Sequence, residues 1–236
     1  MNSPTIVGLN FKEEGIMKKG DFIWGAIFLA FVGILAVPST REAFIGFTSA
    51  HALLGGFIKF ALLASMGELL AVRVGSGGWR FASFFMLRAV IWGLFGILIT
   101  MIFTVYATGT TALLSKGLLP GGDAPLAFAF FTSLLMNTTF APTFMYAHRI
   151  SDMYLDLKHA GEKDLSLGNV VNHIDTSSFW TFVVCKTVPF FWVPAHTLTF
   201  LLPGEYRILA AAMLSIALGL ILTIAKRKQK STVATA

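Results

Sequence analysis

The chain has 236 residues, of which 56% are hydrophobic, 14% aromatic and only 13% charged. Soluble domains carry about 25% charged residues, so this composition excludes an ordinary water-soluble domain and indicates a polytopic membrane protein. The net charge of +6 does not indicate a nucleic-acid-binding protein, because the basic residues lie between and beyond the apolar runs and no nucleic-acid-binding motif accompanies them. The single cysteine, Cys185, excludes an intrachain disulfide and a cysteine-based metal or redox motif.

Residues 1–20 form a polar segment of mixed charge. The segment contains two glutamates and no arginine, whereas a mitochondrial transit peptide is rich in arginine and poor in acidic residues. Lysines precede the apolar run Phe22–Val37, as in a secretory signal, but the run ends at Pro38 without a small-residue cleavage site. We therefore expect this run to be a retained helix.

Six apolar runs reach or approach the length of about 20 residues that a transmembrane helix needs. Turn-forming segments separate them, among them Gly75–Gly78, Leu119–Asp123 and Pro203–Glu205. The sequence predicts an all-α transmembrane bundle of about six spans, with one membrane domain over residues 21–225 and a basic tail over residues 226–236. The expected spans are Phe22–Val37, His51–Val72, Ala82–Tyr106 (extendable towards Leu114), Pro125–Ala147, Ser177–Leu202 and Tyr206–Ala225.

The longest polar connection is Arg149–Thr176, between the fourth and fifth spans. Its apolar residues Ile150, Met153, Tyr154 and Leu157 are spaced as i, i+3, i+4 and i+7. This spacing predicts a short amphipathic helix that lies at the membrane interface. The connection between the first and second spans is expected to be a loop with a short interfacial turn.

Lysine and arginine are distributed unevenly between the two sides of the predicted bundle. With six spans, thirteen of the 18 lie on the side of both termini, whereas only Arg41, Lys116 and Arg207 lie on the opposite side, and Lys59 and Lys186 lie within spans. Cytoplasmic loops carry the excess of basic residues, so both termini are expected on the cytoplasmic side. A five-span topology would place one basic terminal segment on the wrong side.

Polar side chains at membrane depth make up the candidate functional site. Such groups are costly in a bilayer, so each needs a partner or water. Lys59, Lys186 and the group Asn137–Thr139 fall at comparable depths in their spans, and Glu68 lies closer to the cytoplasmic side. Lys59 and Glu68 are half a turn out of phase on one helix, so they are not expected to pair with each other.

Two interpretations of these residues stay open. In the first, they line a water-filled path, which would prefer anions because two lysines face one glutamate. In the second, the lysines extend towards the interface, Glu68 pairs with Arg73 or Arg80, and the Asn-Thr-Thr group forms hydrogen bonds between helices.

The fifth predicted span carries a polar face. Cys185, Pro189, Trp192, His196 and Thr199 are separated by steps of three or four residues and are expected to share one side of the helix. Prolines in a membrane helix release backbone carbonyls that neighbouring polar groups must satisfy, which is typical of bundle interiors and cavities. His196 is either a residue of such a cavity or a structural hydrogen-bonding group. The candidate lining residues are Lys59, Glu68, Asn137, Thr138, Lys186, Trp192, His196 and Thr199.

Two further features concern the end of the membrane domain. Pro203, Glu205 and Arg207 are expected to form a tight turn at the outer surface. Ala211, Ser215 and Gly219 form a stripe of small residues at four-residue spacing, which allows close helix contact. That contact is either within the chain or between subunits of a homo-oligomer.

The segment Trp192–Arg207 resembles the carboxyl-terminal signature of the Mpv17/PMP22 family of small integral membrane proteins. Two shorter elements, Met66–Glu68 and Phe140–Pro142, resemble the Gly-Asp and Phe-Ala-Pro elements of the same family. His196 and Thr199 stand where the family signature has glutamine and asparagine. The signature residues that match are Trp192, Phe200, Pro203, Tyr206 and Arg207.

The resemblance covers residues 50–225 and makes the first helix an amino-terminal addition. It implies a small integral membrane protein from a family in which some members are non-selective or weakly selective channels and no catalytic residues are established. We expect a bacterial cytoplasmic membrane protein, and the mitochondrial inner and peroxisomal membranes, where members of the family occur, are the alternatives.

Three classes of function are consistent with these features. The leading hypothesis is a channel or transporter for small solutes, with the lipid bilayer and small metabolites or anions as partners. The alternative is a non-transporting membrane scaffold with a dry polar core. An intramembrane enzyme is the least favoured class, because the five histidines are scattered without H-x-x-x-H or H-E-x-x-H spacing; we therefore expect no catalytic residues, bound metal or cofactor, and no nucleic-acid partner.

Overall fold

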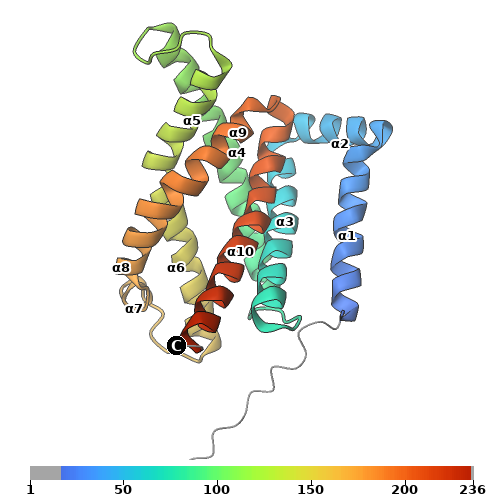
Figure 1. The fold of residues 1–236 in the computed structure, drawn as a ribbon, viewed down its shortest axis with the longest axis vertical. Helices are drawn as coiled ribbons and strands as arrows, with labels where there is room; N and C mark the ends of the chain where they lie inside the picture. Colours follow the sequence, from blue (N-terminus) through green and yellow to red (C-terminus); the bar gives the residue numbers. More distant parts are fainter. Residues whose placement is uncertain (1–16, 235–236) are drawn as a thin grey trace, which may run out of the picture.

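The computed structural model describes the backbone of residues 17–234, with side chains as far as residue 221 and at Ile224 (Figure 1). This part of the chain is all-helical and contains no strand. Four of its helices are long and apolar enough to cross a membrane, which confirms the predicted all-α class with transmembrane helices. They are α1 (Lys19–Ala36), α3 (Ala52–Ser76), α4 (Phe85–Ser115) and the Gly204–Ile221 part of α10 (Gly204–Ala234). Most of the predicted polar segment 1–20 lies outside the described residues.

The connection between α1 and α3 is a helix, α2 (Pro38–Ala50), which lies across the upper end of the bundle in Figure 1. Val37 is extended and separates α1 from α2. Pro38 occupies the first position of α2, where a backbone N–H would have no hydrogen-bond acceptor within the helix, so the missing N–H of proline costs nothing. The prediction of a loop with a short turn is therefore wrong here. Proline at this position starts a helix as readily as a loop, and Phe44 of α2 packs edge-on against Phe31 of α1.

Glycines allow α3 and α4 to cross closely. A Cβ atom on Gly56 would lie 2.7 Å from the carbonyl oxygen of Gly96, a distance that real Cβ contacts do not reach. The hydroxyl of Thr100 donates to the same carbonyl at 2.8 Å. At the lower end, Gly77 ends α3 with a φ of 72°, a left-handed conformation that favours glycine.

The predicted fourth span consists of two helices, α5 (Pro125–Thr139) and α6 (Ala141–His159). The break follows from Pro142, which has no N–H to donate to the preceding turn. The hydroxyls of Thr138 and Thr139 instead donate to carbonyls within α5. Because α6 continues down to His159 (Figure 1), the predicted interfacial helix at 149–157 is the lower part of α6 and not a separate element.

The segment that returns towards the upper end changes helix type along its length. The short helices α7 (Leu167–Asn172) and α8 (Thr176–Ser178) lead into a π-helix, η1 (Phe179–Trp192), which contains Pro189. It is followed by α9 (Val193–Leu201), with Pro194 in its first turn. After the turn at residues 202–203, α10 descends along the bundle, and its helix includes the predicted basic tail as far as Ala234.

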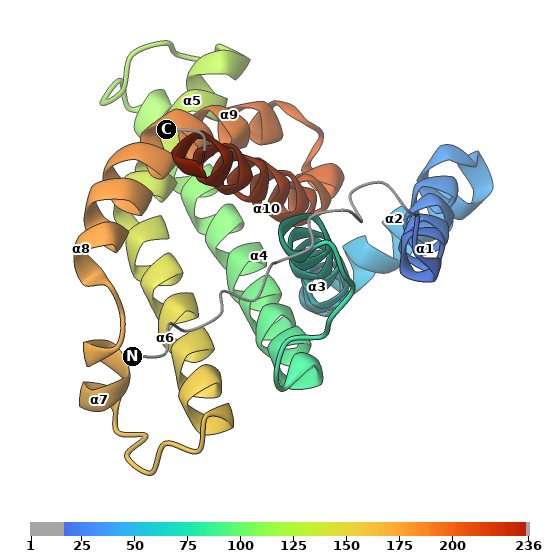
Figure 2. The ribbon, with the colours of Figure 1, turned by 60° about the horizontal axis from the view of Figure 1, so that its bottom comes forward.

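The bundle is built from two groups of helices. α3 packs against both α4 and α10, while α5 packs against α9, and the two groups meet where α4 contacts α5 and α10 contacts α9. Figure 2 shows α1 and α2 at the edge of the bundle beside α3, away from α5 and α6. The core between the two groups is formed by Phe60, Leu63, Met66, Ile99, Phe103, Ala129, Met136, Phe200, Leu209 and Ala212.

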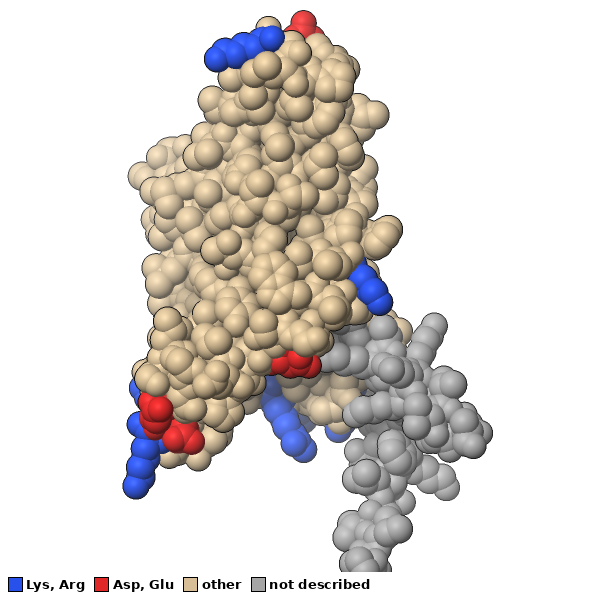
Figure 3. All heavy atoms as spheres, turned by 90° about the vertical axis from the view of Figure 1, so that its left-hand side faces the viewer, with Lys and Arg blue, Asp and Glu red and all other residues tan. Residues whose placement is uncertain are grey.

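The outer surface fits a lipid environment. Figure 3 shows a face with a broad uncharged band below the charged side chains of its upper end; the other charged side chains lie in the lower part, apart from one basic side chain that projects at the right-hand edge about halfway down. Many large apolar side chains are exposed on the helices, for example Leu94 and Val105 of α4 and Phe190 of η1. Contiguous apolar surface of this kind marks contact with a partner or a membrane.

Candidate functional site

A half-open cavity of about 410 Å³ lies at the upper end of the bundle, between α2, α3, α4, α9 and α10. The buried rings of Phe103 and Phe200, 4.9 Å apart, form part of its wall. Its polar lining consists of Thr48, Ser49, Lys59, Thr100, Thr104, Thr108, Glu205 and Arg207.

Lys59 is the most unusual residue of this cavity. It is only 5% exposed, and its ammonium lies 5.2 Å from the ring centre of Phe44, in a cation–π contact. It has no hydrogen-bond or ion-pair partner among residues 17–221. A buried ammonium at membrane depth needs a counter-charge or water, and the cavity is where Lys59 can reach either.

The turn between α9 and α10 forms one wall of the same cavity. Arg207 donates its Nε hydrogen to the carbonyl of Leu202 at 2.9 Å, and its guanidinium packs over the rings of Phe128 and Phe200. Pro203 precedes the first turn of α10, and Gly204 and Glu205 of that turn line the cavity. Two of the three predicted turn residues, Glu205 and Arg207, therefore line the cavity as well as forming the hairpin.

A second polar group, formed by Asn137 of α5 and His196 of α9, lies deeper in the bundle. The Asn137 Nδ2 and His196 Nδ1 atoms are 3.1 Å apart, and the same amide donates to the carbonyl of Ser133 at 2.9 Å. The Ser133 hydroxyl in turn donates to the carbonyl of Val193 at 2.7 Å. All of these groups are buried, so the polar atoms pair with one another across the α5–α9 contact.

Aromatic rings enclose His196. Phe103 contacts the imidazole edge-on from α4, and Trp192 stacks on it with ring centres 5.2 Å apart. Thr199, one turn further along α9, is buried and donates to the carbonyl of Ala195. Trp192, His196 and Thr199 thus share an inward face, as the sequence predicts, but the face is packed against side chains.

A third polar cluster lies at the lower end of the bundle. Arg88 of α4 is 7% exposed, and its two terminal nitrogens each lie 2.6 Å from a carboxylate oxygen of α6, one on Asp152 and the other on Asp156. Its Nε donates to the carbonyl of Ser83. A guanidinium with two carboxylates at this distance forms strong charge-assisted bonds, and here they tie α4 to α6.

Glu68 of α3 belongs to this lower cluster. It accepts a hydrogen bond of 2.7 Å from the indole N–H of Trp92, whose ring lies 4.3 Å from that of His148. His148 Nδ1 is 3.4 Å from a carboxylate oxygen of Asp152. One possible ligand atom from each of Glu68, His148 and Asp152 lies within 4.8 Å of the other two, so these three half-buried residues are the described group that could hold a metal ion.

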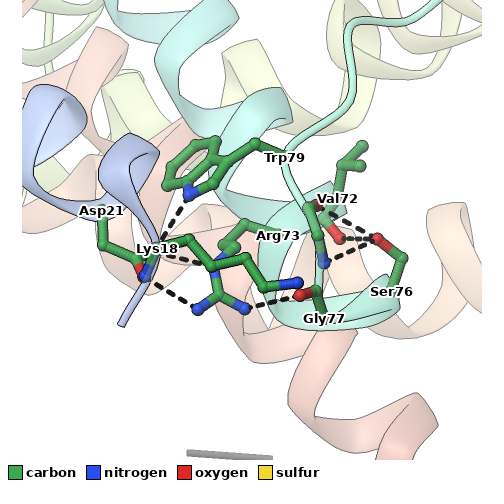
Figure 4. Close-up of polar contacts among 8 residues, drawn as sticks. Lys18, Asp21, Val72, Arg73, Ser76, Gly77 and Trp79 are labelled. Atoms are coloured by element: carbon green, nitrogen blue, oxygen red, sulfur yellow. Dashed lines mark hydrogen bonds and ion pairs between the residues drawn. The ribbon is translucent and has the colours of Figure 1, made fainter. Parts of the chain in front are cut away.

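The predicted pairing of Glu68 with Arg73 or Arg80 is wrong. Figure 4 shows that the guanidinium of Arg73 faces the carboxylate of Asp21 in α1, with nitrogen–oxygen distances of 2.7 and 2.8 Å. The indole N–H of Trp79 donates to the same carboxylate at 3.0 Å. Arg73 therefore fastens α1 to α3, and Arg80 is exposed.

Two predicted lining residues do not join any of these groups. Lys186 is exposed on η1, and Thr138 is exposed on α5, where its hydroxyl donates to the carbonyl of Leu134. Cys185 and Pro189, expected on the inward face with His196, are exposed as well. The predicted meeting of Lys59 with Lys186 at one level of a shared interior is therefore not present in the structure.

The stripe of small residues on α10 makes its contact within the chain. Ala211 is buried in the core, and a Cβ atom on Gly219 would lie 3.5 Å from the carbonyl oxygen of Gly67 in α3. Ser215, which lies between these two residues in the sequence, is half-buried. The stripe thus serves the α3–α10 contact.

Sequence reasoning missed Arg88, Trp92, His148, Asp152 and Asp156. A signal was present, because the last three are spaced four residues apart on one helix and so lie on one face of it. Comparison of the chain with protein-family models, with curated proteins and with solved structures finds no match. The arrangement of the residues alone therefore carries the functional argument that follows.

Proposed function

We propose that the protein is an integral membrane channel or transporter that takes a small anionic solute into the cavity beside Lys59. The observation that carries this proposal is a buried lysine on the wall of a cavity, whose ammonium has no hydrogen-bond or ion-pair partner among the described residues. Membership of the Mpv17/PMP22 family is part of the same proposal and rests on the residues of its signature.

The polar lining favours an anion over a cation. Two cationic side chains, Lys59 and Arg207, face the single carboxylate of Glu205. The free N–H groups in the first turn of α10 add to this preference, because a helix amino terminus attracts negative charge. Ligand sites for small molecules have volumes of about 300–1,000 Å³, so a cavity of about 410 Å³ suits a small organic or inorganic anion.

The proposed topology has six crossings. α1, α3, α4 and α10 would cross as single helices, while α5 with α6 and η1 with α9 would each cross as a consecutive pair. Both ends of the chain would then lie on the side with thirteen basic residues, the cytoplasmic side. The cavity would open on the outer side.

Passage of a solute requires a conformational change in this proposal. Phe103 and Phe200 line the cavity, Phe103 also contacts His196 of the bonded Asn137–His196 pair, and these buried groups would have to separate for a solute to pass. Because the α3–α4–α10 and α5–α9 groups meet along this line, their relative movement would open the path, as in alternating-access transport.

Flux measurements with a matched pair of lysine variants test the proposal. The purified protein is placed in liposomes, and uptake of small anions such as chloride, phosphate and acetate is compared with that of potassium. Lys59→Met should lower anion flux about tenfold, the equivalent of about 1.4 kcal/mol of lost attraction. Lys186→Met removes an exposed lysine and should leave flux unchanged. Absence of flux in the unmodified protein, or an equal effect of both substitutions, would refute the proposal.

A non-transporting scaffold with a dry polar core is the second candidate. The observation that favours it is the Asn137–His196–Ser133 group, in which the polar atoms bond to each other and are buried. In that case the cavity beside Lys59 would be a surface recess that never connects to the other side of the membrane, and the liposome assay would show no flux for any variant.

A further inference from the structure

The polar cluster at the lower end of the bundle is separate from the upper cavity and contains possible metal ligands. Glu68 and Asp152 are partly buried carboxylates from two different helices, and His148 lies between them with its ring against Trp92. We propose that Glu68, His148 and Asp152 bind a divalent transition-metal cation of the zinc or manganese class. This proposal is independent of solute transport.

The geometry is that of an open three-ligand site. His148 and Asp152 are four residues apart on α6 and so project from the same face, with the Nδ1–Oδ2 distance at 3.4 Å. Ligand atoms about 2.0–2.2 Å from a tetrahedral zinc ion lie roughly 3.3–3.6 Å from one another. The ligand atoms of the group all lie within 4.8 Å of one another. A bound ion would therefore draw Glu68 inward by about an ångström, and water would occupy the fourth coordination position of the ion.

The local charge favours a divalent cation. The carboxylates of Asp152 and Asp156 bind the guanidinium of Arg88, and Glu68 adds a third carboxylate beside Asp152 and the imidazole of His148. When the carboxylates are ionised, they exceed the charge of Arg88 by two, and the burial of Glu68 and Asp152 makes this excess costly although Asp156 is exposed. One divalent cation neutralises the cluster. The nearby Arg149 also lies on α6, but its side chain is exposed.

The donor set indicates the class of ion. Imidazole nitrogen is a preferred ligand of zinc, iron, nickel and copper, whereas magnesium and calcium prefer oxygen ligands alone. The outer contacts support ligand positions as well, since Trp92 donates to Glu68 and Arg88 donates to Asp152. Such supporting hydrogen bonds orient metal ligands in proteins.

Binding would have a structural consequence. Glu68 is on α3 and the other two ligands are on α6, and these helices belong to different sides of the bundle. A bound ion would therefore join α3 to α6 at the lower end and hold the two sides together.

Direct metal binding by the full chain tests this proposal. The protein is purified in detergent with an affinity tag that lacks histidine, stripped with a chelator, and titrated with Zn²⁺, Mn²⁺ and Mg²⁺. We expect saturable binding of one Zn²⁺ or Mn²⁺ per chain by equilibrium dialysis, with a change in Trp92 fluorescence, and much weaker binding of Mg²⁺. Trp92→Phe should remove the fluorescence change and, because it also removes the hydrogen bond to Glu68, weaken Zn²⁺ binding about 10- to 100-fold.

Substitutions then assign the ligands. Glu68→Gln, His148→Gln and Asp152→Asn should each weaken Zn²⁺ binding by at least about 100-fold, the upper end of the effect of losing a supporting residue. Glu68→Gln is the most informative of them, because its amide oxygen still accepts the Trp92 bond and the fold is least disturbed. His159→Gln changes an exposed histidine of the same helix and should bind as tightly as the unmodified protein.

Several results would overturn the assignment. The first needs only the unmodified protein: if it does not bind one Zn²⁺ or Mn²⁺ with a dissociation constant below about 100 µM, there is no specific site, whatever the variants do. Retention of full affinity in folded Glu68→Gln would remove α3 from the site, and an equal loss in His159→Gln would show adventitious binding to surface histidines.

Discussion

Removal of the Asn137 side chain tests whether the centre of the bundle is a dry, bonded contact. Asn137→Leu deletes the partner of the His196 imidazole, which lies 3.1 Å away, and both residues are almost fully buried, with 1% and 9% of their surface exposed. An unsatisfied buried polar group costs about 1–3 kcal/mol in soluble proteins, whereas hydrogen bonds between membrane helices average about 0.6 kcal/mol and reach about 1.7 kcal/mol. Because this pair is shielded by Phe103 and Trp192, we expect a loss near the upper membrane value, about 1.5 kcal/mol in the free energy of unfolding.

A double-mutant cycle isolates the bond itself. His196→Phe keeps a ring between Phe103 and Trp192 and should cost a similar amount alone, but combined with Asn137→Leu it leaves no unpaired polar atom from the pair. The double variant should therefore lose about 1 kcal/mol less than the sum of the single variants, a coupling typical of residues in contact. Unfolding in mixed detergent micelles, followed by tryptophan fluorescence and circular dichroism, gives these energies. Additive losses would refute the reasoning, because a water-filled path would supply each group with a new partner.

Three further predictions concern the packing and the connections of the bundle. Gly56→Val should destabilise the protein by about 3 kcal/mol in a detergent melting assay, because its side chain would collide with the α4 backbone, whereas Gly109→Val, in open space, should have little effect. Arg73→Gln should let α1 move away from α3, measured as a broader distance distribution between spin labels on the two helices, while Arg80→Gln at an exposed site should not. Hydrogen bonds from Ser166 lower the pKa of Asp164 in the loop between α6 and α7; the resulting stabilisation of the loop is present at neutral pH and should be lost as the pH falls through that lowered pKa, as faster amide hydrogen exchange at the loop would show.

Much of the helical organisation follows from local sequence signals. The turns at Gly77 and Pro203 interrupt long apolar runs, and the helices on either side begin or end within a few residues of the expected positions. The expected loop after Val37 is instead a helix, because an amphipathic segment at the end of a bundle can be helical without crossing it. The expected end of a helix at Ala147 is also wrong, since the polar residues that follow, including Asp152, bind Arg88 of another helix.

The wrong face assignment of Cys185 and Pro189 has a specific physical cause. The sequence pattern assigns helix faces on the assumption of 3.6 residues per turn, but Phe179–Trp192 is a π-helix with i to i+5 hydrogen bonds. Its wider turn shifts every residue before Trp192 around the axis relative to an α-helix. Face assignments therefore hold from Trp192 onward, for His196 and Thr199, and fail for Cys185 and Pro189 earlier in η1.

Depth in the membrane does not by itself bring polar residues together. Lys59, the Asn137–His196 pair and Glu68 each meet the cost of burial differently, by access to a cavity, by mutual hydrogen bonds and by a bond from Trp92. Which of these occurs depends on contacts between residues far apart in the chain, 59 residues for Asn137 and His196 and 24 for Glu68 and Trp92. Among the described residues, only Lys59 combines an unpaired ammonium with a cavity, which is why we assign solute binding to that cavity and regard the centre as the barrier that a transported solute must cross.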